Sequence, residues 1–333
     1  NVIKIKGAKY VNIRDFEITG TRNTGISASG KNVKLSYLSI NRLSGAGIGL
    51  SGKNMTVEGC HIYSTGQKGI DVSGGDSKTL EPSNNLIFNN HIHDNGRLVT
   101  TYEGAIRVGG VGTIIKNNLM YNGTHVGLTM GGLDNIAEYN DIHDFLKTSS
   151  DMGAIYMNNG YPNRGNVIRY NSIHDCLSGS SQVGAGDVGG GWEIYGIYLD
   201  NFTSGVSVIG NVINNIMGKA VMVNGGRDNT VKNNIFANVR YGAYLSASSM
   251  NQSWGWYQSI MSGSSDRGLA LGSKVYGVDT VKYKEAPYDK YPHLANILED
   301  DFPKPKYNEL KNNVAYQTNG VYQIEPMTSS GSG

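Results

Sequence analysis

Apolar residues recur at every second position in short segments along most of this chain, and glycine or asparagine separates the segments. Each segment reads as a small residue, an apolar residue, a variable residue and a second apolar residue, as in 47–50 (GIGL) and 69–72 (GIDV). An alternation of period two is typical of a β-strand that buries one face. No helical pattern of ten or more residues separates the segments. The chain is therefore predicted to consist of short strands joined by tight turns.

A second repeat pairs two asparagines with a following apolar residue and is clearest in residues 85–94, 135–144 and 166–175. Its later asparagine tolerates the sharp bend of a turn, and its side chain can hydrogen-bond to the next copy. We expect these asparagines to stack from coil to coil. They are Asn90, Asn118, Asn140, Asn171, Asn211, Asn234 and Asn313.

The spacing of the copies decides the architecture. The shortest spacing is about 20 residues, which fits one coil of three strands, and longer spacings carry insertions. A propeller blade needs ~40 residues and four strands, and a left-handed hexapeptide helix needs strict six-residue periodicity. We therefore predict an all-β fold, a right-handed single-stranded parallel β-helix, or solenoid, of about ten coils.

The repeat also divides the chain. Residues 1–245 are predicted to form the coils, and 246–306 a non-repeating excursion that packs on the helix. The excursion could cover the solenoid or line a substrate groove. Residues 307–325 read as a terminal coil and 326–333 as a disordered tail or linker. The strand-like start without a leader predicts that the natural protein begins further upstream.

The composition narrows the classes of molecule that are expected to bind this chain. Among 333 residues, 46 are glycine and 17% are charged, and the formal net charge is +2. Such a balance gives no electrostatic footprint for nucleic acid, and no apolar stretch approaches the ~20 residues that span a bilayer. We expect a monomer with neither nucleic acid nor membrane as partner.

One row of variable residues is expected to point outward on a single face. Small residues that carry tyrosines, amides and an arginine suit a sugar chain, because rings stack on pyranoses and amides bind hydroxyl groups. Alternatively, the tyrosines only favour strands. We predict substrate binding by Arg107, Tyr156, Asn158 and Tyr198 on this face, and by Trp254 and Trp256 of the excursion. The row is Ser27, Gly49, Asp71, Arg107, Thr129, Tyr156, Tyr198, Met222 and Tyr244.

Carboxylates beside this face suggest the chemistry. Asp151 precedes one strand segment and Asp200 ends the next, while Glu103 and Glu193 precede strands in the same relative place as Asp151. Glycoside hydrolysis needs two converging carboxyl groups, one as acid and one as base or nucleophile. We predict Asp151 and Asp200 as the catalytic pair, with Glu103 and Glu193 binding substrate. Turn capping is the alternative role of each acid.

Basic residues offer further candidates. His125 falls just before a strand of this face and is predicted to contact substrate, and Arg107 could bind an acidic sugar or pair with Glu103 or Asp71. His93, His143 and His174 recur at one repeat position and are explained by a stack on a side sheet, so we predict no metal site. No cofactor is expected, although a structural Ca²⁺ stays open.

Segments 123–127 (GTHVG), 151–156 (DMGAIY) and 196–200 (GIYLD), with the late segments 286–294 and 300–306, resemble glycoside hydrolase family 141. The resemblance runs from about Asn85 to Asn313. It implies a β-helical extracellular bacterial enzyme of fucosidase or xylanase type, with Asp151 and Asp200 as catalytic residues. The insertion around Asp187 departs from the family pattern.

Three functions follow as hypotheses. The first is a secreted or cell-surface bacterial glycoside hydrolase that cleaves a plant, algal or microbial polysaccharide. The second is a polysaccharide lyase on a uronate polymer, in which Arg107 with His125 or a tyrosine would supply the cation and the base. The third is a non-catalytic carbohydrate-binding or adhesion solenoid.

Overall fold

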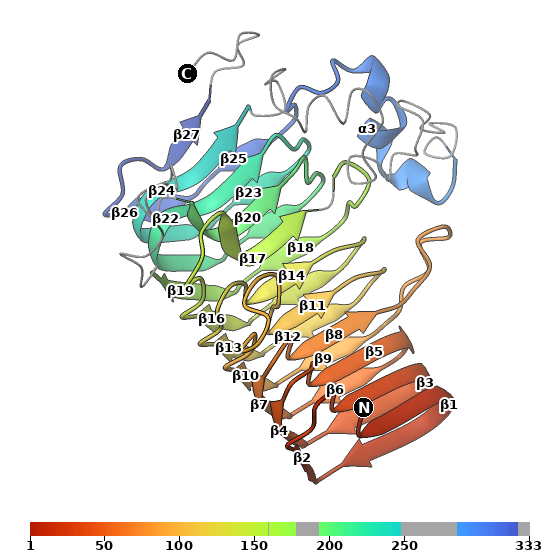
Figure 1. Ribbon diagram of the computed structural model, residues 1–333. Helices are drawn as coiled ribbons and strands as arrows, with labels where there is room; N and C mark the ends of the chain where they lie inside the picture. The colour runs from red at the N-terminus through yellow and green to blue at the C-terminus, as the bar shows by residue number, and fades with distance from the viewer. Residues whose placement is uncertain (159, 178–192, 248–284, 326–333) are drawn as a thin grey trace.

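The computed structural model describes residues 1–158, 160–177, 193–247 and 285–325, which form one 27-stranded sheet wound into a three-sided helix (Figure 1). Each strand pairs in parallel with the strand one coil further on. Ile26 lies opposite Ile48, for example, and Ile48 lies opposite Ile70. The predicted all-β parallel solenoid is confirmed.

The pairings divide the strands among three faces, and β1, β3, β22 and β24 turn a corner from one face to another. The first face contains parts of β1 (Ile3–Arg14), β3 (Ile26–Ser36), β22 (Val212–Asn224) and β24 (Ile235–Ser246), with β5 (Ile48–Lys53), β8 (Ile70–Ser73), β11 (Ile106–Val108), β14 (Leu128–Met130), β17 (Met152–Asn158), β20 (Ile194–Asp200) and β27 (Tyr322–Ile324). The second face continues β1 and β3 with β6 (Thr56–Glu58), β9 (Leu86–Phe88), β12 (Ile114–Lys116), β15 (Ile136–Glu138), β18 (Val167–Arg169), β21 (Ser207–Ile209), β23 (Thr230–Lys232) and β25 (Glu309–Lys311). The third face contains β2 (Glu17–Thr19), β4 (Ser39–Leu43), β7 (His61–Thr65), β10 (His91–His93), β13 (Leu119–Tyr121), β16 (Asp141–His143), β19 (Ser172–Cys176), the first parts of β22 and β24, and β26 (Val314–Tyr316).

The core lies inside the three faces and consists of stacked aliphatic side chains. Ile48, Ile70, Ile106 and Leu128 follow one another on the first face and are fully buried. Burial of such a side chain stabilises the fold by ~1.5–3 kcal/mol. The alternation of period two thus places the apolar residues inward and the residues between them on the outer side of the sheet, where those of β17 and β20 are also buried.

The predicted asparagine stack is present as a hydrogen-bonded ladder. The backbone N–H and Nδ2 of Asn140 both donate to Oδ1 of Asn171, each at 3.0 Å. Nδ2 of Asn171 also donates to the carbonyl oxygen of Ala137 at 3.0 Å. The same pattern joins successive members from Asn90 to Asn313. The ladder satisfies buried polar groups and fixes one coil on the next.

The bend itself lies one residue before each ladder asparagine. Asn89, Asn117 and Asn233 adopt the left-handed conformation, with φ of 55°, 54° and 58°, and Tyr139 and Tyr170 adopt it at the same position with φ of 55° and 56°. Asparagine tolerates this conformation better than most residues. The sequence repeat therefore marks a turn residue followed by a ladder residue.

The late part of the chain packs outside the coils. Its helices are η2 (Tyr288–Lys290), α3 (Pro292–Ala295) and η3 (Ile297–Glu299), and within the described residues no helix is long and apolar enough to cross a membrane. Tyr288, Leu294 and Ile297 pack against apolar side chains at the corner between the first two faces, namely Leu80, Val111, Leu133, Tyr161 and Phe202. The fully buried Arg227 donates to the carbonyl oxygen of Asp300 at 3.1 Å and pairs with its carboxylate. This segment thus flanks the first face, and β25, β26 and β27 then form a last coil.

Replacement of a ladder asparagine should destabilise the fold strongly. In Asn171→Ala, the buried N–H and amide of Asn140 lose their acceptor, which we expect to cost ~3 kcal/mol. The measurement is the midpoint of urea unfolding followed by circular dichroism. Asn296→Ala, at an exposed position in the late segment, is the control. Equal midpoints for the two variants would contradict the structural role of the ladder.

Candidate functional site

The first face carries the predicted row of outward side chains in register. The pairings run from Ser27 through Gly49, Asp71, Arg107 and Thr129 as predicted. They continue through Tyr156, Tyr198, Met222 and Tyr244, but the first three of these are only 6%, 4% and 8% exposed, so this part of the predicted row is buried. Side chains on successive coils therefore lie next to one another at the ~4.8 Å spacing of paired strands.

The N-terminal half of this face is a shallow trough of about 290 Å³ with small polar side chains. Arg107 lies at one end of the trough and its Nε is 3.5 Å from the Asp71 carboxylate. The arginine side chain is 54% exposed, so it remains accessible to a ligand. Of the two roles predicted for Arg107, substrate contact and an ion pair, the geometry includes the ion pair with Asp71. The lining residues are Ser27, Ala28, Ser29, Gly49, Leu50, Ser51, Asp71, Val72, Ser73, Arg107 and Gly109.

The C-terminal half holds a cluster that we call the tyrosine cluster, made of Tyr156, Tyr195, Tyr198, Lys219 and Tyr244. The ring of Tyr198 lies 4.6 Å from that of Tyr195 and 5.6 Å from that of Tyr156, in edge-on arrangements. Lys219 Nζ lies 5.0 Å from the Tyr195 ring centre and 4.5 Å from the Tyr244 ring centre. β17, β20, β22 and β24 thus bring one amine and four phenols together.

Asp200 anchors the polar side of this cluster. Its carboxylate accepts hydrogen bonds from the Tyr156 hydroxyl at 2.8 Å, from Asn224 Nδ2 at 2.8 Å, and from the backbone N–H and Nδ2 of Asn201 at 2.7 and 3.0 Å. Asn224 Nδ2 also donates to the Tyr198 hydroxyl at 3.3 Å. Asp200 is only 7% exposed. Four donors therefore surround it, and a proton on either oxygen would compete with one of them.

The surroundings move the pKa values of the cluster in opposite directions. Burial raises the pKa of Tyr198, and the charges of Asp200 and Asp151 raise it further. Burial, followed by nearby carboxylates, likewise raises the pKa values of Tyr156 and Tyr195. Burial lowers the pKa of Lys219, and the charge of Glu193 partly offsets this shift. The phenols therefore keep their protons, while the amine loses its proton more easily than an exposed lysine.

The predicted catalytic pair lies on one wall but at opposite ends of its strands. Asp151 is exposed, directly precedes β17 and has a left-handed φ of 55°. Asp200 ends β20 and lies opposite Asn158, the last residue of β17. Both charges act on the Tyr198 hydroxyl, which therefore lies in the field of both carboxylates. Their catalytic role stays a prediction.

The other predicted contacts divide into two groups. Tyr156 and Tyr198 belong to the tyrosine cluster, Asn158 is half-buried at its edge, and Glu193 acts on Lys219 through its charge. Glu103 is paired with Lys68 at 2.7 Å, one coil earlier. Trp254 and Trp256 lie outside the described residues.

His125 is buried away from the surface. It is 3% exposed, its Nδ1 accepts the backbone N–H of Tyr102 at 2.9 Å, and burial lowers its pKa to about 4. The neutral ring thus holds the chain before β11, and a substrate contact at Nδ1 would require that hydrogen bond to break. The predicted substrate contact gains no support from this geometry.

Sequence reasoning missed Lys219 and Tyr195 because the corner of the coil shifts the alternation. By the alternation of period two, Gly196 would point outward like Tyr198, two residues later. A Cβ there would lie 2.7 Å from both the Ala220 carbonyl oxygen and Ile213 Cγ2, so this position faces the next coil and must stay small. The outward residue is the one before the small residue. Tyr195 before Gly196 and Lys219 before Ala220 carry the signal that could have revealed them.

Comparisons with solved structures show related architecture. The A-module of mannuronan C-5 epimerase AlgE4 from Azotobacter vinelandii superposes with a TM-score of 0.58 at 12% identity, over 99% of this chain and 76% of the other. The AlgE6 A-module from the same organism gives 0.55 at 16% identity, over 68% of this chain, which spans 57% of that module. XylC in complex with xylose gives 0.52 at 12% identity, over 93% of this chain and 53% of the other. At these identities the likeness concerns the fold.

A search of the curated proteins finds no match to this sequence. The chain does match the family described as "Right handed beta helix region", over residues 1–102 and 104–273. The match covers most of the chain and agrees with the observed three-sided coils. These matches do not test the resemblance to glycoside hydrolase family 141. The chain belongs to the right-handed beta helix family.

Proposed function

We propose that this chain is a carbohydrate-active enzyme that binds a uronate-containing polysaccharide along its first face and removes the C5 proton of one sugar at the tyrosine cluster. One observation carries the proposal. Lys219 lies against the rings of Tyr195 and Tyr244, and burial lowers its pKa, while the pKa values of the neighbouring phenols are raised. A base with a lowered pKa beside acids with raised pKa values is an arrangement that suits acid–base catalysis.

The chemistry assigns a role to each group. The neutral amine of Lys219 takes the C5 proton, and the electrons of the C5–H bond move toward the sugar carboxylate. In elimination, they form the C4=C5 double bond as the C4–O4 bond breaks, and a phenol, for which Tyr198 is the candidate, protonates O4. In epimerisation, a phenol of the cluster instead donates a proton to C5 on its opposite face. Both reactions start with the same proton transfer.

The sugar carboxylate needs a positive partner. Arg240 is half-buried on β24, its guanidinium carbon lies 5.6 Å from the Tyr241 ring centre, and its charge lowers the pKa of Lys219. A guanidinium can hold a carboxylate with two parallel hydrogen bonds. Arg240 therefore replaces Arg107 as the candidate cation for this reaction, and Arg107 in the trough can bind a neighbouring uronate.

The names of the similar structures agree with this chemistry without deciding it. Two of them are mannuronan C-5 epimerases, and mannuronan is a uronate polymer. The polysaccharide partner, the monomeric state and a secreted or cell-surface location belong to the same proposal.

Hydrolysis is the second candidate, and one observation favours it. The charges of Asp151 and Asp200 both act on the Tyr198 hydroxyl, so both carboxylates lie within electrostatic reach of the tyrosine cluster. The four hydrogen bonds that Asp200 accepts engage both of its carboxylate oxygens, which weighs against contact of this residue with a sugar. We therefore rank proton abstraction first.

The products separate the candidates. The chain is incubated in D₂O with uronate polymers, including mannuronan, and with neutral xylan, and the products are analysed by ultraviolet absorbance and mass spectrometry. We expect either an absorbing unsaturated sugar or deuterium at C5, and only from uronate polymers. New reducing ends with neither signal would support hydrolysis instead, and binding without any product would support an adhesion or binding role.

Loss of the Lys219 amine should abolish this reaction. Lys219→Met removes the base and should lower kcat by at least ~100-fold while circular dichroism stays unchanged. Lys232→Met, on the second face, is the matched control and should keep full activity. Near-normal activity of the Lys219 variant would exclude this residue as the base.

The pH profile should identify the base. Because the reaction needs neutral Lys219, kcat should rise with pH and level off above a pKa that is lower than the ordinary lysine value of 10.5. The charged groups that act on Lys219 are Glu193, Arg240 and Glu325. Glu193 raises its pKa, so Glu193→Gln should move the rising limb to lower pH. A limb that moves to higher pH, or a profile that falls from an acidic maximum, would contradict this assignment.

A further inference from the structure

Seven aromatic side chains form two adjacent columns on the outside of the third face. One column stacks Tyr63, His93, Tyr121, His143 and His174, with ring centres 4.8–5.2 Å apart. The other contains His61 and His91, which are register partners on β7 and β10 and stack at 4.6 Å with an angle of 13° between their planes. His93 lies two residues after His91 on the same strand. Three histidines therefore meet where the columns are adjacent.

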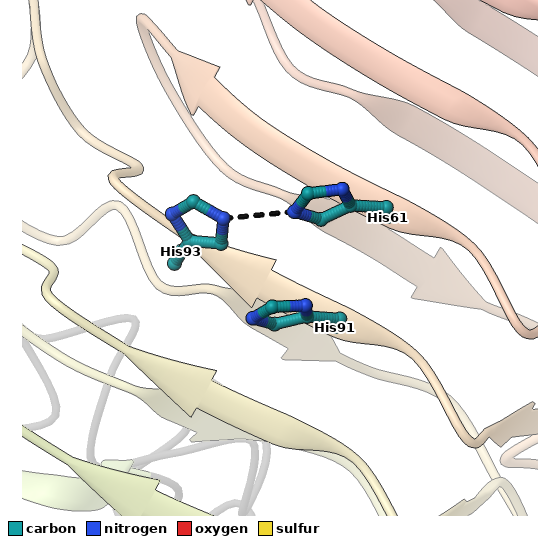
Figure 2. Close-up of side chains that lie close together, drawn as sticks. All are labelled: His61, His91 and His93. Atoms are coloured by element: carbon teal, nitrogen blue, oxygen red, sulfur yellow. Dashed lines mark hydrogen bonds between the residues drawn. The ribbon is translucent and has the colours of Figure 1, made fainter.

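The ring nitrogens of these histidines converge. One nitrogen from each of His61, His91 and His93 lies within 4.8 Å of the other two, and Nε2 of His61 is 2.9 Å from Nε2 of His93. Figure 2 shows the rings of His61 and His91 one above the other, each with a nitrogen on the side toward His93. Nitrogens bound to one tetrahedral Zn²⁺ at ~2.0 Å lie ~3.3 Å apart, so the stacked rings of His61 and His91 must rotate out of their parallel arrangement to complete the site.

A carboxylate sets the tautomer of His93. Nδ1 of His93 lies 2.6 Å from the Asp94 carboxylate, which can only accept, so Nδ1 carries the proton. Nε2 of a neutral His93 then presents a lone pair to His61. A histidine that donates its other N–H to a carboxylate is the usual second-shell arrangement of metal-bound histidine. His143 and His174 make the same contact with Asp144 and Asp175, each at 2.7 Å, so it is the convergence of ring nitrogens that distinguishes His93.

Burial favours the neutral form of two of the ligands, and strand pairing holds all three in place. Burial, followed by neighbouring histidines, lowers the pKa values of His61 and His91. All three residues project from paired strands, which hold their backbones more rigidly than loops would. Nε2 of His91 also lies 3.1 Å from the Tyr121 hydroxyl, and this hydrogen bond would be exchanged for a metal bond.

We propose that His61, His91 and His93 bind a divalent transition-metal ion of the Zn²⁺ class, which joins the coils of β7 and β10. The three nitrogens leave a fourth position for water or a ligand group, because the side chains are only partly buried. Imidazole donors favour such ions over Ca²⁺ or Mg²⁺, which prefer oxygen. The site lies on a different face from the tyrosine cluster and does not depend on the proposed reaction.

Zinc titration of the full chain tests this site. Isothermal titration calorimetry with Zn²⁺ alone should give one ion per chain, and Co²⁺ should give the visible absorption of a tetrahedral complex. His61→Gln and His93→Gln should each weaken binding at least tenfold, and Asp94→Asn should weaken it by ~10–100-fold through the loss of the second-shell contact. His174→Gln, in the same column but outside the cluster, should leave the affinity unchanged.

Two results would overturn the proposal. One is no stoichiometric binding of Zn²⁺ or Co²⁺ to the wild-type chain. The other is binding that persists in the His61→Gln/His93→Gln double variant or disappears in His174→Gln. Circular dichroism of each variant shows whether the coils remain folded. An increase in the unfolding midpoint with Zn²⁺ for the wild type, absent in the double variant, would support the site independently.

Discussion

The asparagine ladder is the interaction on which the rest of the structure depends. Backbone pairing alone allows one coil to slip on the next, and a slip of one residue would exchange inward and outward side chains. Each ladder amide donates to the coil below and to the next asparagine, as Asn171 does with Ala137 and Asn211. The ladder thus selects one register. Because the register is constant within each face, an outward position on one strand becomes part of a continuous column along that face.

These columns explain how reactive side chains from successive coils come together on a repetitive surface. On the first face, the column passes from serine and glycine through Asp71, Arg107 and Thr129, and tyrosines begin at β17, so an open trough leads to a crowded cluster. Crowding removes water, and the loss of water raises the pKa values of the phenols and lowers that of Lys219. On the third face, a single extra histidine pair beside a stacked column brings three imidazoles together. Function in this fold therefore depends on which residues neighbour each other one coil apart.

Much of this architecture could be predicted from the sequence, because the strands, the turns and the ladder asparagines each correspond to a repeated sequence pattern. The outward row from Ser27 to Tyr244 also follows from alternation alone. Lys219 and Tyr195 could not be found that way, since the corner before each small residue changes the phase. The hydrogen bonds of Asp200 and the meeting of His61 with His93 depend on contacts between coils separated by insertions of unequal length. Such contacts depend on which residues pair between neighbouring coils, and the spacing of the repeats in the sequence does not determine that pairing.

The central claim is that the fold holds an amine with a lowered pKa among phenols that stay protonated. The most direct measurement is an NMR titration of the chain with ¹³Cε-labelled lysine, with Lys219→Arg to assign the signal. The account predicts that the Lys219 signal titrates below the ordinary lysine value of 10.5 and below the exposed lysines of the same chain. A Lys219 signal that titrates at or above that value would contradict the proposed base and the reaction built on it.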